Sequence, residues 1–321
     1  MERQEIIQSV QASGLSIRRA CRAAGISRST YYRWRCPASR MDRGPAWNAL
    51  REEDRKHILA VSESRPEWSS RQIAFHVTDS GSFSVSESTV YRVLKAAGKI
   101  PLHPGEPQRA SGEYIDKPER VHDQWQIDFT DFFLPSWGWY HDGGVLDDKS
   151  RFMLHHDLRP YEKACDAIEI IDDAVSFAVG THGYAARRVV SDHGKCFESA
   201  DTKSYLHFRN IRPIYARSHH PQTVGKLERL HRTMKEVVNL HVYESPEELQ
   251  RAIDQFYYFY NYERYHESLG NVTPSDVYYG KVEAVLERRR QIKLRTLIER
   301  RTRYETWKQR KDLTLAALGG T

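Results

Sequence analysis

The sequence predicts a multidomain α/β protein, with helices at both ends and a mixed sheet of strands in the middle. Helical periodicity broken by glycines and N-capping serines fills the first 100 residues, and strand and helix patterns alternate from about residue 121. The last 40 residues continue as a highly charged helix. At 321 residues, the chain is long enough for several domains. We expect five segments, with bounds 1–40, 41–100, 101–120, 121–280 and 281–321.

The first segment has the pattern of a helix-turn-helix unit. A short helix beginning at Ile17 ends at Gly25, where a residue that tolerates positive φ is needed. Ser27 then caps a second helix that runs to Trp34. We expect this unit to bind DNA, although a hairpin that serves only packing is the alternative. The outward face of the second helix offers side chains suited to phosphates and base edges, namely Arg28, Ser29, Tyr32 and Arg33.

The second segment repeats this motif. Residues 26–34 return as 85–93 with five identical residues, and the second copy has six more residues between its two matched stretches. Ser88 and Arg92 repeat the exposed serine and arginine of the first copy, whereas Glu87 replaces an arginine. We therefore expect a second helix-turn-helix unit that contacts DNA, with a packing hairpin again as the alternative. After it, the prolines and glycines of residues 101–120 predict a linker.

The strands of the middle segment begin at residue 124. Apolar and polar residues alternate over 124–132 as in a half-buried strand, and the turn-prone residues 147–150 join two further expected strands, over 139–145 and 152–158. Together with later helices these strands describe a mixed α/β domain of about 160 residues. The later elements are expected to be a helix over 162–179, a strand over 188–192, a helix over 202–208, a strand over 211–215, a helix from residue 225 and a helix over 246–262.

The net charge of +6 is unevenly distributed. Residues 1–40 carry +6 and residues 281–312 carry +7, which leaves −7 for the rest of the chain. This distribution predicts polyanion contacts at both ends and a need for carboxylates in the centre. We expect the basic C-terminal helix to contact the DNA backbone, the alternative being a solvated helix with acid–base pairs.

Composition limits the class of protein further. The mean hydropathy is −0.71, and no apolar run approaches the roughly 18 residues of a membrane span. The N-terminus shows no apolar targeting core, and the scattered cysteines, four in all, form no disulfide or metal-binding pattern. We expect a cytoplasmic protein without membrane contact.

Three carboxylates of the middle segment are candidate metal ligands. Asp128 and Asp192 stand at the ends of expected inner strands, where a half-buried carboxylate needs a basic partner or a metal. Glu228 lies on the helix from Gly225, and the cationic side chains that share its face are His231, Arg232 and Lys235. Oxygen ligands favour Mg²⁺ or Mn²⁺ over zinc, so we expect a metal and a phosphate chain to meet here.

The segments around these acids resemble the catalytic core of retroviral integrases and bacterial insertion-sequence transposases, which carries two aspartates and a glutamate. Asp128 lies in Trp-Gln-Ile-Asp-Phe-Thr, Asp192 in Ser-Asp-His-Gly, and Glu228 in the segment 220–229, with 35 residues between the last two acids. Residues 259–270 are similar to the signature that closes the core in insertion-sequence family three. The resemblance covers residues 60–280.

The resemblance implies an RNase H-like fold and a DNA transposase. Asp128, Asp192 and Glu228 would bind two Mg²⁺ or Mn²⁺ ions that assist cleavage at a DNA 3′ end and strand transfer. The implied partners are double-stranded DNA, as terminal inverted repeats and target, and further copies of the chain in a homodimer or higher oligomer. It also implies that Lys235 holds the DNA end. The alternative function is a transcriptional repressor that binds DNA and keeps a vestigial core.

The sequence departs from the family at several positions. Val224 stands in place of an asparagine, and Leu230-His231 replaces an aromatic residue and asparagine. No His-His-Cys-Cys module precedes the core, so zinc is not expected from the resemblance.

Other polar residues have structural interpretations. Asp131 is expected to face the opposite side of the sheet from Asp128. Asp147 and Asp148 are expected to shape a turn, and the aromatic run over 256–260 is expected to be helix core. His193 either contacts substrate or fills the turn after Asp192.

Overall fold

The computed structural model describes residues 3–35, 46–100, 118–215 and 225–318. Its contacts divide the chain into two compact units: residues 1–51 with 297–321, and residues 52–296. Within the described residues, no helix combines the length and apolar character that crossing a membrane requires.

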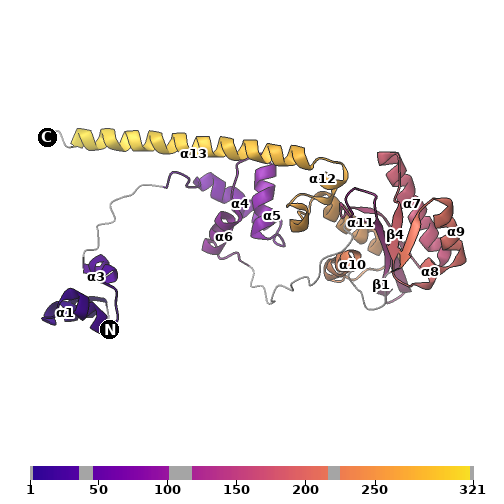
Figure 1. Ribbon diagram of the computed structural model, residues 1–321, viewed down its shortest axis with the longest axis horizontal. Helices are drawn as coiled ribbons and strands as arrows, with labels where there is room; N and C mark the ends of the chain where they lie inside the picture. Colours follow the sequence, from indigo (N-terminus) through magenta and orange to yellow (C-terminus); the bar gives the residue numbers. More distant parts are fainter. Residues whose placement is uncertain (1–2, 36–45, 101–117, 216–224, 319–321) are drawn as a thin grey trace. The chain divides into compact units, whose positions relative to one another are not determined.

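The N-terminal helices form a small three-helix domain (Figure 1). The expected turn is present: Gly25 has φ of +68°, and the Ser27 hydroxyl accepts a hydrogen bond from the Thr30 amide at 3.0 Å. The helix-turn-helix prediction is therefore confirmed for this segment. Its helices are α1 (Arg3–Ala12), α2 (Ile17–Ala23) and α3 (Arg28–Arg35). Their shared core consists of Val10, Ala20, Cys21 and Tyr31.

A second helical group precedes the sheet, and it contains the repeated motif. Its helices are α4 (Glu52–Ser64), α5 (Ser70–Asp79) and α6 (Glu87–Ala96). Ser69 and the side chain of Gln72 form a capping box at the start of α5. The extra residues of this copy are shared between helix and turn, because α5 has 10 residues against 7 in α2 and the connection to α6 is longer than that between α2 and α3.

A five-stranded mixed sheet with the order β3-β2-β1-β4-β5 forms the centre of the second unit. Its strands are β1 (Trp125–Leu134), β2 (Gly138–Asp147), β3 (Met153–Arg159), β4 (Arg188–Ser191) and β5 (Arg212–Tyr215). β1 pairs antiparallel with β2 and parallel with β4, so the long central strand joins an antiparallel half to a parallel half. The predicted strands are confirmed. β1 and β2 extend further than predicted and form a hairpin, whose turn lies between Leu134 and Gly138.

Helices cover both faces of this sheet. Trp125 and Ile127 of β1 pack towards α7 (Ala164–His182), together with α8 (Lys195–Glu198) and α9 (Ala200–Phe208). Phe132 and Leu134 point the other way, into a core with α10 (Gly225–Val238) and α11 (Pro246–Tyr262). This alternation builds three layers with the mixed sheet in the middle, the RNase H-like architecture that was expected (Figure 1).

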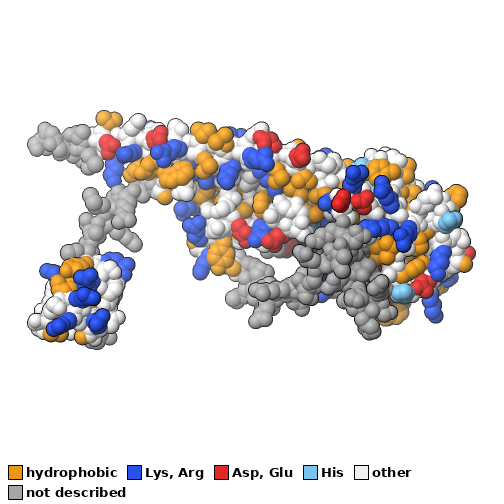
Figure 2. Space-filling model, viewed as in Figure 1, with side chains coloured by type: hydrophobic (Ala, Val, Ile, Leu, Met, Phe, Trp, Pro, Cys, Tyr) orange, Lys and Arg blue, Asp and Glu red, His pale blue; other side chains and the backbone are white. Residues whose placement is uncertain are grey.

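The chain closes with a short 3₁₀ turn, η1 (Glu267–Leu269), the helix α12 (Pro274–Tyr278) and the 37-residue helix α13 (Val282–Leu318). In the second unit, the Arg289 guanidinium of α13 donates two 2.7 Å hydrogen bonds to the Asp79 carboxylate at the end of α5. Basic side chains are frequent along α13, with acidic and apolar ones between them (Figure 2). Acid–base pairs such as Arg290–Glu287 therefore accompany the expected positive charge.

Candidate active site

Asp128 on β1 and Asp192 directly after β4 lie beside each other where two parallel strands are paired. In the β1–β4 register Gln126 pairs with Val190, and each aspartate follows two residues later, Asp128 within β1 and Asp192 just past the end of β4 at Ser191. Both therefore face the α10 side of the sheet. One detail of the prediction was wrong: Asp128 is not at the end of its strand, because β1 continues to Leu134. Asp128 is accessible because the neighbouring strand β4 ends at Ser191.

A backbone amide orients each aspartate. The Phe129 amide donates to Asp128 Oδ1 at 3.0 Å, and the Gly194 amide donates to Asp192 Oδ1 at 2.9 Å. A Cβ at Gly194 would come within 2.9 Å of Asp192 Oδ1, so a larger residue there would have to displace this carboxylate. The Gly194 amide in the turn after β4 therefore holds the Asp192 carboxylate in place.

Helix α10 brings Glu228 and the expected cations to the same place. Asp128, Glu228, His231, Arg232 and Lys235 all line one open cleft of about 550 Å³. Burial raises the pKa of the Glu228 carboxyl, and the negative charge of Asp128, with a further contribution from Asp192, raises it more. The three predicted acids therefore form one electrostatic cluster.

This cluster fits a hard divalent cation. Its donors are carboxylate oxygens, which Mg²⁺ and Mn²⁺ prefer. After burial, the charges of Asp128 and Asp192 raise the pKa of Glu228. A cation bound here would offset this repulsion among the carboxylates.

The structure gives His231 a different place from the one expected. Its side chain was expected to contact DNA, but the residue is only 4% exposed. Its Nδ1 lies 3.5 Å from Asp128 Oδ2, on the inner side of α10. His231 is thus situated to position Asp128, because this side of α10 packs against the sheet.

Lys235 and Arg232 retain the expected outward role. Lys235 lies on the cleft, with its ammonium 5.5 Å from the centre of the Phe132 ring. Arg232 is exposed beside it. The i+4 and i+7 spacing from Glu228 therefore places two cations on the same wall of the cleft as the glutamate.

A buried polar network that sequence reasoning missed fixes the start of α10. Lys226 Nζ lies 2.6 Å from Asp148 Oδ1, and the pair is almost completely buried. Gln126 joins them, because its amide donates to Asp148 at 2.7 Å and its carbonyl accepts from the Leu227 amide at 3.2 Å. Burial lowers the pKa of Lys226, and nearby Arg151 lowers it further. The one sequence signal for this network was Gln126, a polar residue at a position of β1 expected to face inward.

The neighbouring aspartates therefore differ in role. Asp147 shapes the turn as predicted, accepting hydrogen bonds from the amide and hydroxyl of Ser150 at 2.7 and 2.6 Å. Asp148, predicted to do the same, instead anchors α10 through Lys226.

The remaining candidates lie outside the cleft. His193 pairs with Glu198 at 2.5 Å and stacks on Tyr215, which fills the turn after Asp192. In the aromatic run, Phe256, Tyr257 and Tyr260 are buried as expected of helix core, whereas Tyr258 is exposed, which departs from that prediction. Residues 220–224, the first half of the segment that carries Glu228 and the place of Val224, lie outside the described residues.

The predicted DNA-contacting side chains of the helix-turn-helix units are exposed. They are Arg28, Ser29, Tyr32 and Arg33 on α3, and Ser88 and Arg92 on α6. Glu87 pairs with Arg71 of α5 at 2.9 Å. The glutamate that replaces an arginine in the second unit therefore forms an ion pair inside that unit.

Comparisons with known proteins agree with this division. Two models, each described as an integrase core domain, match residues 118–221 and 209–274, and a model of a helix-turn-helix domain matches residues 2–36. The ORF3 protein of Spiroplasma virus SpV1-C74, to which an integrase function is provisionally assigned, is 28% identical over 153 residues. That match covers 42% of this chain, and the chain spans about two fifths (41%) of the viral protein's length.

Several solved structures are also similar. The HTLV-2 integrase catalytic core domain in complex with magnesium has a TM-score of 0.41 and 18% identity, covering 50% of this chain and 98% of that one. The BIV integrase catalytic core domain has a TM-score of 0.40 and 19% identity, covering 51% and 97%. Residues 118–274 thus carry an integrase core domain, and residues 2–36 a helix-turn-helix domain.

Proposed function

We propose that this chain is an insertion-sequence transposase, which binds the ends of a DNA element and catalyses metal-dependent 3′-end cleavage and strand transfer. One observation carries the proposal. Asp128 on β1, Asp192 directly after β4 and Glu228 on α10 lie close enough together that both aspartates raise the pKa of the glutamate, in addition to burial. The integrase core match supports the same class of reaction.

In this proposal Asp128, Asp192 and Glu228 hold two Mg²⁺ or Mn²⁺ ions. When bound, such ions activate the attacking hydroxyl and stabilise the leaving oxygen during in-line displacement at phosphorus. The chain's own contribution is positional. His231 orients Asp128, and the Lys226–Asp148 pair holds α10 against the sheet. Arg232 and Lys235 neutralise phosphates of the DNA end through charge-assisted hydrogen bonds.

Recognition of the element belongs to the helical units. Arg28, Ser29, Tyr32 and Arg33 of α3 read the terminal repeat, while Ser88 and Arg92 of α6 supply a second contact. The chain acts as a homodimer or higher oligomer on DNA, because an element has two ends to join. The signature over 259–270 favours insertion-sequence family three, whose members work on DNA in the bacterial cytoplasm.

The test uses the full-length protein and duplex DNA that carries the sequence flanking its reading frame. We expect 3′-strand cleavage and joining that require Mg²⁺ or Mn²⁺. Asp128→Asn, Asp192→Asn and Glu228→Gln should each abolish both steps yet retain the gel shift, because phosphate contacts rather than carboxylates dominate affinity. Asp173→Asn, an exposed acid of α7, is the matched control and should keep wild-type cleavage.

The same assay separates the alternative function. A repressor with a vestigial core would retard the flanking DNA in a gel but would not cleave it with either Mg²⁺ or Mn²⁺. Cleavage that survives any one of the three substitutions would remove that acid from the catalytic set.

A further inference from the structure

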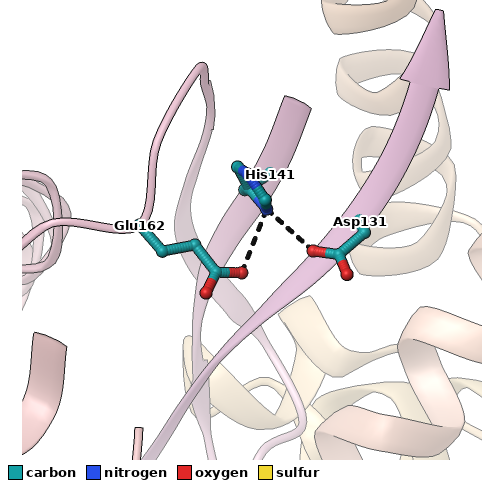
Figure 3. Close-up of side chains that lie close together, drawn as sticks. All are labelled: Asp131, His141 and Glu162. Atoms are coloured by element: carbon teal, nitrogen blue, oxygen red, sulfur yellow. Dashed lines mark hydrogen bonds and ion pairs between the residues drawn. The ribbon is translucent and has the colours of Figure 1, made fainter. Parts of the chain in front are cut away.

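A second cluster of metal-ligating side chains lies on the opposite face of the sheet from Asp128. Asp131 of β1 is the register partner of His141 on β2, and Glu162 comes from the segment just before α7. Nδ1 of His141 lies 2.8 Å from Asp131 Oδ1 and 3.0 Å from Glu162 Oε1 (Figure 3). All three side chains point to one spot.

Hydrogen bonding alone explains this arrangement poorly. One ring nitrogen has at most one hydrogen to donate, yet two carboxylates approach it at near-equal distances. The two carboxylates also repel each other, since their ligand oxygens lie within 4.8 Å. A proton held within the cluster or a bound cation would each offset this repulsion.

We propose that Asp131, His141 and Glu162 form a binding site for a divalent cation, separate from the Asp128–Asp192–Glu228 set, and that its preferred ion is zinc. The three ligand atoms lie within 4.8 Å of one another. Ligands of a tetrahedral zinc ion are roughly 3.4 Å apart, given metal–ligand distances of about 2.1 Å. Small rotations of the two carboxylates are therefore enough to admit the ion, and their two negative charges balance it.

The donor set determines the choice of ion. An imidazole nitrogen with two carboxylates suits Zn²⁺, which binds such sites more tightly than Mn²⁺. Mg²⁺ prefers oxygen ligands and keeps much of its water, so it competes weakly here. The two sites of the domain thus differ in chemistry: oxygen donors on the α10 face, and a mixed nitrogen–oxygen set on the α7 face.

The position of the cluster indicates what the ion does. Asp131 and His141 belong to the β1–β2 hairpin, whereas Glu162 belongs to the connection between β3 and α7. The side chains of Asp131 and Glu162 are 54% and 41% exposed, which leaves room for a water or a phosphate oxygen as a fourth ligand. A bound ion therefore ties the start of α7 to the hairpin and leaves one coordination position open.

The binding test uses the full-length chain carrying Asp128→Asn, Asp192→Asn and Glu228→Gln, so that the oxygen-donor set is removed. Zn²⁺ is titrated against a chromophoric chelator in a large excess of Mg²⁺, and Co²⁺ is added separately as a spectroscopic probe. We expect one tight Zn²⁺ equivalent that Mg²⁺ does not displace, together with a Co²⁺ absorption band in the visible region.

His141→Ala and Glu162→Gln, each added to this background, should lose that equivalent and the Co²⁺ band. Glu162→Gln changes an exposed connecting segment and keeps the side-chain size, so a folded protein is expected. His193→Ala is the matched control, because His193 is also paired with a carboxylate but belongs to no three-residue cluster. Its zinc equivalent should remain.

Two results would overturn the inference. One is unchanged zinc stoichiometry after both substitutions, which would locate the ion elsewhere. The other is no zinc binding in the background protein, which would leave a shared proton as the explanation of the contact. Neither result bears on DNA cleavage, so failure here is distinguishable from failure of the transferase proposal.

Discussion

At the scale of single residues, buried charges connect the sheet to its helices. His156 of β3 lies between two carboxylates, 3.1 Å from Asp142 and 3.2 Å from Asp254 of α11. Burial alone would lower the pKa of His156, but the two carboxylates outweigh burial and raise it to about 9. This histidine is therefore charged when the protein is folded at neutral pH.

The raised pKa predicts a specific loss of stability in alkali. Below pH 6.5 both the folded and the unfolded chain hold the proton, and the stabilisation is complete; between 6.5 and about 9 only the folded chain holds it, and the stabilisation disappears. This shift corresponds to roughly 3 kcal/mol. Urea unfolding of wild type and His156→Gln at pH 6 and pH 9 should show a gap that narrows by about that amount. A gap that stays constant would mean that His156 is uncharged in the folded protein.

The Lys226–Asp148 pair should matter for both folding and activity. Removing one partner leaves a buried charge, so Lys226→Met should lower the free energy of unfolding by about 3–5 kcal/mol. Adding Asp148→Asn removes the unpaired buried charge and should restore part of the loss, since the asparagine Oδ1 can still accept a hydrogen bond from the Gln126 side-chain amide. Denaturant unfolding measures both variants. A loss below about 1 kcal/mol in Lys226→Met would show that the pair does not anchor α10.

At the scale of elements, the rotation of α10 determines which side chains meet DNA. Lys235 lines the cleft with Glu228, whereas Arg229 lines a separate pocket with Arg151 and Lys226. The two positions therefore face different surroundings on the same helix.

Cross-linking can test this rotation. In a background with the native cysteines replaced by alanine, Lys235→Cys should form a disulfide with a thiol placed on the terminal nucleotide of the DNA end. Arg229→Cys should not, because position 229 lines the separate pocket with Arg151 and Lys226 and is absent from the cleft lining. The reverse pattern would mean that the DNA end enters from the other side of α10.

The elements themselves were largely predictable, because periodicity and caps are local. Alternation predicted β1, and the three acids were candidate ligands from the residue pattern before the resemblance grouped them into one catalytic set. Contacts distant in sequence were not predictable. Lys226 and Asp148 are 78 residues apart, so nothing in the local pattern links them. The burial of His231 was missed for a related reason: helical spacing places it near Glu228, but only the packing of α10 on β1 shows that it faces inward.

At the scale of the whole molecule, the residues proposed for recognition and those proposed for chemistry lie in different parts of the chain, so we expect substitutions to separate the two functions. In the full-length protein, Arg28→Ala with Arg33→Ala should cost about 1–3 kcal/mol of discrimination per lost base contact. Competition between the element end and random DNA at several salt concentrations measures this. Arg18→Ala with Arg19→Ala, on the exposed side of α2, removes the same charge and should weaken binding to both DNAs alike. Equal effects of the two double variants would locate sequence recognition elsewhere.

The bond between Asp79 and Arg289 has a consequence for synthesis of the protein. Its partners are 210 residues apart, and Arg289 also lies 4.6 Å from the centre of the Phe75 ring on α5. At about 5–20 residues per second, a ribosome adds Arg289 about 10–40 s after Asp79. During that interval the nascent α5 lacks its ion pair with Arg289. A product terminated before α13 never forms this ion pair. The Asp79–Arg289 contact therefore stabilises the second helical group only in chains that have been translated through to the start of α13.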